Sequence, residues 1–160
     1  MQDDPEGEAE IAVGLCRRFD LDGYIANAES AYEGAGRWKS AVFVRRFREL
    51  APHAPLALSH IGWGMPYRDL DFKPWLDAGA CLMPQCYEAN FATSVHRSLE
   101  STDALGVPRS RIIPTLGTSG FAIRYPTDLY ASEVREAWVT GFNVWLLEST
   151  NDDTLRQLAA

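Results

Sequence analysis

The chain has 160 residues, of which 46 % are hydrophobic, and its formal net charge is −7. This size and composition are sufficient for one domain with a substantial core and exclude a disordered chain. The negative charge argues against a protein that follows a phosphate backbone, so no nucleic-acid partner is expected. The sequence lacks the run of about 18 apolar residues that a membrane-spanning helix needs, and its acidic amino terminus is unlike a secretory signal. We therefore expect no membrane contact, while localisation stays open between the cytoplasm and a virion.

Segments with helical and extended patterns alternate along the chain. Within Glu8–Phe19, Ile11, Leu15 and Phe19 are spaced about four residues apart, with Ala12 and Cys16 beside them, which predicts an amphipathic helix. Further helices are expected at Trp38–Leu50, Lys73–Asp77, Phe91–Leu105, Leu129–Thr140 and Asn151–Leu158. Strands are expected at Tyr24–Glu29, Leu56–Ile61, Cys81–Tyr87, Arg111–Leu116 and Asn143–Leu147.

This alternation predicts an α/β fold with a parallel five-stranded sheet joined by helical crossovers. No GxGxxG or GxxxxGK[ST] motif follows a strand, which argues against a nucleotide site, and no cofactor is expected. Cys16, Cys81 and Cys86 have no CxxC spacing, so they are predicted to be free thiols, and no metal site is expected. We interpret residues 1–160 as a single domain that forms the carboxyl-side portion of a (β/α)8 TIM barrel. An open-sheet enzyme for a small molecule is the alternative.

The carboxyl ends of the strands are where ligands bind in parallel α/β folds. The first predicted strand ends in Asn27 and Glu29, which strand alternation places on one face together with Ile25. A carboxyl group at such a position can act as a general acid if burial raises its pKa. Glu29 is therefore the candidate catalytic residue. The alternative is a loop carboxylate that caps a turn or pairs with an arginine.

Later strand ends supply amide, imidazole and aromatic side chains that suit the hydroxyls and rings of a sugar. These candidate substrate-binding residues, together with Asn27, are His60, Gln85, Tyr87 and Trp145. His60 has no triad partner in the sequence, so a purely structural histidine is the alternative. Trp145 can equally fill the core of a barrel, and Gln85 and Tyr87 can support Glu29 through hydrogen bonds.

Two segments carry a resemblance to a known group of proteins. The D-G-Y-x-x-x-x-E segment Asp22–Glu29 and the M-P-Q-x-Y segment Met83–Tyr87, with Trp145 near the end, resemble glycoside-hydrolase-like or lysozyme-like TIM barrels of bacteria and phages. The resemblance implies that Glu29 occupies the position of the strand-end acid. It also implies a carbohydrate ligand, and hydrolysis of a cell-wall-type polysaccharide is the expected activity.

Two features separate the chain from that group. Related hydrolases often carry aspartate two residues before the glutamate, where this chain has Asn27. An amide cannot hold charge as a carboxylate does, which favours the alternative of an inactive barrel remnant with a binding or assembly role, for example in a phage particle. A complete barrel has about 250 residues, so three strand–helix units are missing by this interpretation. We therefore expect a partner chain or self-association to complete the sheet, unless the chain is a fragment.

Overall fold

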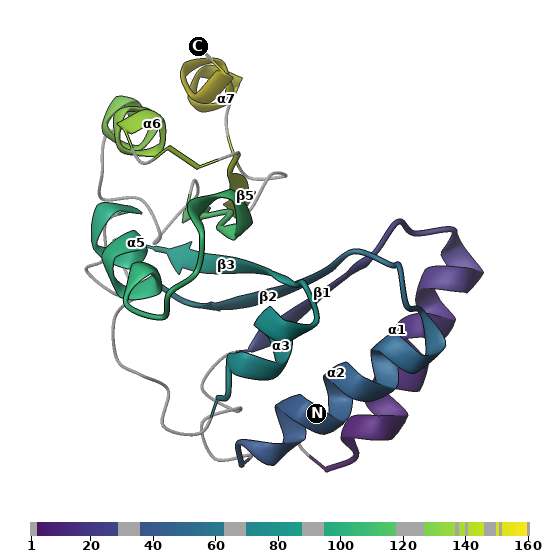
Figure 1. Ribbon diagram of the computed structural model, residues 1–160. Coiled ribbons are helices and arrows are strands. Elements are labelled where there is room, and N and C mark those ends of the chain that lie inside the picture. Colours follow the sequence, from purple (N-terminus) through teal and green to yellow (C-terminus); the bar gives the residue numbers. More distant parts are fainter. Residues whose placement is uncertain are drawn as a thin grey trace. The chain divides into compact units, whose positions relative to one another are not determined.

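The computed structural model has an α/β fold in which helices alternate with the strands of one five-stranded sheet (Figure 1). It describes residues 3–28, 36–62, 70–87, 95–117, 127–136, 138–139, 141–145, 150 and 152–159. The helices are α1 (Pro5–Phe19), α2 (Trp38–Leu50), α3 (Lys73–Asp77), α5 (Val95–Asp103), α6 (Thr127–Glu136) and α7 (Asp152–Ala159). The strands are β1 (Tyr24–Ala28), β2 (Leu56–Ile61), β3 (Cys81–Cys86), β4 (Thr115–Gly117) and β5 (Asn143–Trp145). No described helix is long and apolar enough to cross a membrane.

The strands are parallel and lie in the order β1-β2-β3-β4-β5, so each new strand is added beside the preceding one. A doubly wound sheet reverses its direction of growth at a switch point, and this strand order contains no reversal. The predicted α/β fold with a five-stranded parallel sheet is thus confirmed, and the strand order is that of a portion of a (β/α)8 barrel.

The chain divides into two compact units. The first contains α1, β1, α2 and α3, and the second contains α5, β4, α6, β5 and α7. The division passes through β2 between Ser59 and His60 and through β3 between Cys81 and Leu82.

The first unit is held together by an aromatic cluster. The ring centroid of Tyr24 in β1 lies 6.2 Å from that of Phe43 and 6.1 Å from that of Phe47, both of α2. Phe43 also stacks on Trp75 of α3 at 5.5 Å. Phe43, Phe47 and Trp75 are all buried. Burial of these rings supplies the apolar surface that fixes α2 and α3 against the sheet.

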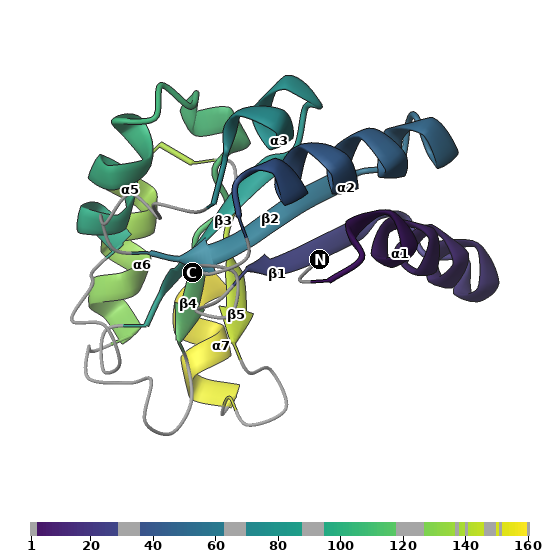
Figure 2. The same ribbon diagram turned by 90° about the horizontal axis from the view of Figure 1, so that it is seen from below.

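Helix α1 begins and ends with recognisable caps and packs against α2 (Figure 2). The Asp4 carboxylate accepts a hydrogen bond from the Gly7 amide at 2.9 Å, and Pro5 occupies the first turn. Ion pairs from Arg45 to Glu6 at 2.9 Å and from Arg46 to Glu10 at 2.5 Å join the two helices. These contacts fix which side of α1 faces α2.

The buried side of α1 carries only part of the predicted apolar residues. Small side chains face the core, namely Ala9, Ala12, Val13 and Cys16. Ile11, Leu15 and Phe19 are exposed by 64 %, 42 % and 59 %. Helix α1 packs against α2, and its small side chains are the ones withdrawn from solvent. The predicted helix is confirmed, and of its predicted apolar residues Ala12 and Cys16 are buried, whereas Ile11, Leu15 and Phe19 are exposed.

In the second unit, the strands are aligned by a regular register. Gln85 lies opposite Thr115 between β3 and β4, and an isolated bridge joins Leu82 to Ile112 with the same register. Strand β4 is shorter than the predicted strand Arg111–Leu116, because Arg111 belongs to a 3-10 turn and Pro114 lies opposite Pro84. Neither proline has an N–H to donate, so the ladder between the strands is interrupted there.

Candidate functional site

One face of strands β3, β4 and β5 carries a row of polar side chains. Gln85 pairs with Thr115, and Thr115 pairs with Asn143. Residues paired in register on parallel strands project from the same face of the sheet, so these three side chains lie side by side. Their neighbours on the opposite face are Cys86, Leu116 and Val144, of which Cys86 and Leu116 are completely buried. The polar row therefore occupies the face turned away from the apolar core of the unit.

An aromatic row follows on the same face, two residues further along the strands. Gly117 pairs with Trp145, and the register of β3 with β4 continues to place Tyr87, the residue after β3, beside Gly117. Neighbouring strands lie about 4.8 Å apart, so the backbones that carry the two aromatic rings are about 10 Å apart. Gly117 of β4 lies between them and has no side chain. We call the residues Gln85, Thr115, Asn143, Tyr87 and Trp145 the polar–aromatic face.

The polar–aromatic face is covered at β3 and β4 and open to solvent at β5. Gln85 and Tyr87 are buried, whereas Asn143 is exposed and Trp145 is 48 % exposed. Thr115 is 3 % exposed, and its hydroxyl has no hydrogen-bond partner among the described residues. A buried hydroxyl without a partner costs about 1–3 kcal/mol. The centre of the polar row thus contains a buried polar group that has no partner among the described residues.

His60 lies on the other face of the sheet. The Gly62 amide donates to the Gln85 carbonyl at 3.1 Å, which places Ile61 of β2 opposite Gln85 and turns His60 away from it. Its Nδ1 lies 2.9 Å from the Ile61 carbonyl oxygen, and burial lowers the pKa of His60 to about 4. The ring is therefore neutral near pH 7 and donates to that carbonyl through Nδ1. This position favours the structural role, while substrate binding by His60 stays a prediction.

Gly62 lets the end of β2 approach β3 and α5 closely. A Cβ atom at Gly62 would lie 2.4 Å from the Gln85 carbonyl oxygen and 2.6 Å from the Ser98 hydroxyl oxygen. Any larger residue would have to displace the backbone of Gln85. Glycine at position 62 therefore permits the close approach to Gln85, the first residue of the polar row.

The first predicted strand end lies in the other unit. Ile25 and Asn27 are exposed on one face of β1, while Ala26 and Ala28 are buried on the other, which confirms the predicted alternation. Glu29 follows β1 directly but lies outside the described residues, so its role as catalytic acid stays a prediction. Of the predicted site residues, the structure brings together Gln85, Tyr87 and Trp145.

Thr115 and Asn143 are the residues of the polar–aromatic face that only the structure identifies. Neither residue is among the candidate site residues predicted from the sequence, where Asn143 appears only as the start of a strand. Strand alternation alone places Asn143 on the same face as Trp145, which is the signal that could have identified it. Its position beside Thr115 depends on the register, which no local pattern specifies.

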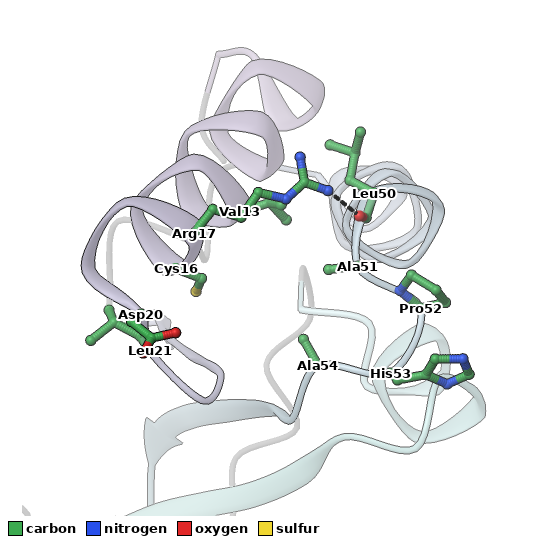
Figure 3. A pocket seen from close by; sticks show the side chains of 10 residues that line it. All are labelled: Val13, Cys16, Arg17, Asp20, Leu21, Leu50, Ala51, Pro52, His53 and Ala54. Carbon is green, nitrogen blue, oxygen red and sulfur yellow. Dashed lines mark hydrogen bonds between the residues drawn. The ribbon is translucent and has the colours of Figure 1, made fainter.

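An open pocket of about 400 Å³ lies in the first unit, between the end of α1 and the segment after α2 (Figure 3). Arg17 reaches across it and donates to the Leu50 carbonyl at 2.7 Å, and the Cys16 thiol lies 3.4 Å from the Gly23 carbonyl oxygen. Its lining residues precede β1 and β2, at the amino ends of the strands. Ligands of parallel α/β folds bind at the opposite ends, so we do not place the function here.

The three cysteines are free, and no cluster of potential metal ligands occurs in the part of the chain that the structure describes. In comparisons with known proteins, no protein-family model, no curated protein and no solved structure matches this chain.

Proposed function

We propose that the polar–aromatic face binds a carbohydrate of the cell-wall type. The observation that carries this proposal is the register that aligns Gln85, Thr115 and Asn143 in one row, with Tyr87 and Trp145 in the next. Amides and hydroxyls exchange hydrogen bonds with sugar hydroxyls, while aromatic rings stack on the apolar faces of pyranoses. A ligand that displaced the groups covering Thr115 would give its hydroxyl the partner that it lacks among the described residues.

The choice of a cell-wall polysaccharide rests on the resemblance of Asp22–Glu29 and Met83–Tyr87 to glycoside-hydrolase-like barrels. The uncharged character of the polar–aromatic face is suited to a neutral glycan. The function that these residues support best is non-catalytic attachment to such a polymer, for example by a protein of a phage particle.

Hydrolysis of the same polymer is the second candidate function. It rests on Glu29, which would protonate the leaving-group oxygen as a general acid. Most glycosidases need a second carboxylate, and the described strand positions of the polar–aromatic face carry none. Asn27, two residues before Glu29, supplies an amide where a charged partner would be expected. These two features favour binding over hydrolysis.

Binding is tested by titrating the chain with chitooligosaccharides and with soluble peptidoglycan fragments, followed by calorimetry or NMR. We expect Trp145→Ala to weaken binding about tenfold, because it removes the exposed stacking surface. Asn143→Ala should weaken binding by a similar factor. Trp38→Ala is the matched control, since Trp38 is an exposed tryptophan of the first unit. Absence of binding, or equal affinities of wild type and Trp145→Ala, would contradict the proposal.

Hydrolysis is tested separately by measuring turnover of the same substrates with wild type and Glu29→Gln. Turnover by the wild type that is lost in Glu29→Gln would support the catalytic role of Glu29. Equal background rates, together with binding that depends on Trp145, would leave the non-catalytic function.

A further inference from the structure

Helix α1 presents an apolar stripe that nothing in the described chain covers. Ile11 and Leu15 are exposed on the side of the helix away from α2, and Phe19 and Leu21 extend the apolar surface at its end. Single exposed apolar residues are normal on protein surfaces, but a contiguous row along one helix is typical of an interaction site. The stripe belongs to a helix that is well capped and firmly joined to α2 by ion pairs. It is thus a rigid surface.

Charges of opposite sign flank Ile11 and Leu15 along the helix. Glu8 lies three residues before Ile11, and Arg18 lies three residues after Leu15. With 3.6 residues in each helical turn, these four residues fall within an arc of about 80° on the helix surface. We call Glu8, Ile11, Leu15 and Arg18 the α1 stripe. The order of these four residues, which is charged, apolar, apolar and charged, is symmetric about position 13.

This symmetry indicates which partner covers the α1 stripe. We propose that the α1 stripe is an isologous interface with a second copy of this chain, in which two α1 helices pack antiparallel about a two-fold axis. In this arrangement Ile11 of one copy meets Leu15 of the second copy, and Glu8 of one meets Arg18 of the other. Both pairs occur twice, as two-fold symmetry requires.

The charges also select the direction of packing. A parallel pair of helices would place Glu8 against Glu8 and Arg18 against Arg18, so both ends would repel. Antiparallel packing turns both ends into attractive pairs and also opposes the helix dipoles. One helix face buries less area than a standard interface, so the dimer is a weak one that forms in a concentration-dependent way.

The test uses the full chain and measures its mass by sedimentation velocity over a range of micromolar concentrations. Wild type should pass from monomer to dimer as concentration rises. Leu15→Glu should abolish the dimer, because it places charges within the apolar contact. Leu105→Glu is the matched control, since Leu105 is exposed by 40 %, close to the 42 % of Leu15, but lies in the second unit. It should dimerise like the wild type.

Charge exchange tests the antiparallel arrangement itself. Glu8→Arg and Arg18→Glu should each weaken dimerisation at least about tenfold, because each variant faces two like-charged pairs. A mixture of the two variants should dimerise again, since arginines of one chain then face glutamates of the other. A lost protein fold cannot explain such rescue by mixing.

Three results would overturn the proposal. The first is a wild-type chain that stays monomeric over the whole range of concentrations. The second is equal loss of the dimer in Leu15→Glu and Leu105→Glu, which would place the contact elsewhere. The third is a mixture of Glu8→Arg and Arg18→Glu that remains monomeric, which would exclude antiparallel pairing of α1.

Discussion

The two units differ in which kind of group lies in an unfavourable environment. In the first unit, the α1 stripe leaves large apolar side chains in contact with water. In the second, the polar row buries the Thr115 hydroxyl without a partner among the described residues. An exposed apolar surface is stabilised when another protein surface covers it. A buried unpaired hydroxyl is stabilised only when a polar group reaches it. These two features are the grounds for the two proposals, a second copy of the chain at α1 and a polar ligand at the polar row.

The largest expected effect concerns the aromatic cluster of the first unit. Phe43→Ala removes a ring that contacts Tyr24, Phe47 and Trp75, and we expect the free energy of unfolding to fall by about 4 kcal/mol. Urea denaturation followed by circular dichroism measures this change. Trp38→Ala, which removes an exposed ring from the same helix, should change stability by less than about 0.5 kcal/mol. Similar losses in both variants would show that the cluster is not the core of this unit.

The next effect is a pH dependence that originates in the second unit. The pKa of His60 is lowered to about 4 by burial, so the folded state resists the protonation that the unfolded state accepts at its usual pKa. The contribution of the neutral ring to stability is complete above about pH 6.5 and is lost as the pH falls toward 4, by roughly 3 kcal/mol.

The measurement is the difference in unfolding free energy between wild type and His60→Gln at several pH values. Glutamine has no titration in this range, so the advantage of the wild type should shrink as the pH falls from 6.5 to 4. A difference that stays constant over this interval would mean that the pKa of His60 is the same in the folded and the unfolded chain, and would contradict its lowering by burial.

A smaller effect is expected where β2 approaches β3. Gly62→Ala places a Cβ atom against the Gln85 backbone and the Ser98 hydroxyl, and we expect a loss of about 2 kcal/mol in the free energy of unfolding. Because Gln85 must shift, carbohydrate affinity should fall as well.

Gly14→Ala in α1 is the control and should raise the free energy of unfolding, since nothing lies within 4 Å of an added Cβ there. At concentrations where the chain is monomeric, it should gain about 0.5–1 kcal/mol from helix propensity. Equal effects at both glycines would contradict the close approach at Gly62.

The features that the sequence predicted correctly are those specified by local patterns. Alternation of Ile25 and Asn27 with Ala26 and Ala28 assigns the two faces of β1, because the side-chain period of a strand is fixed at two. Apolar runs and intervening helical segments are equally local, and they were sufficient for the five parallel strands.

The features that the sequence did not predict depend on distant partners. Which residues of α1 are buried depends on its packing against α2, and small residues such as Ala12 are buried while Leu15 is exposed. The row of Gln85, Thr115 and Asn143 depends on register across three strands, and the short β4 depends on Pro114 lying opposite Pro84. Each of these requires knowing which segments meet, which periodicity within one segment does not contain.

The smallest expected effect separates stability from function at the polar row. Thr115→Val keeps the shape of the side chain and replaces the buried hydroxyl, which has no partner among the described residues, with a methyl group. We expect the free energy of unfolding to rise by about 1 kcal/mol without ligand, because the desolvation penalty disappears. Carbohydrate affinity should fall in the same variant, since the ligand loses a hydrogen bond at the centre of the row.

Thr102→Val is the matched control. The Thr102 hydroxyl donates to the Ser98 carbonyl at 2.8 Å, so this variant should be less stable than the wild type. If Thr115→Val is destabilised like Thr102→Val, the Thr115 hydroxyl has a partner within the folded chain. The second unit would then be closed without a ligand, and the contrast between the two units would rest on α1 alone.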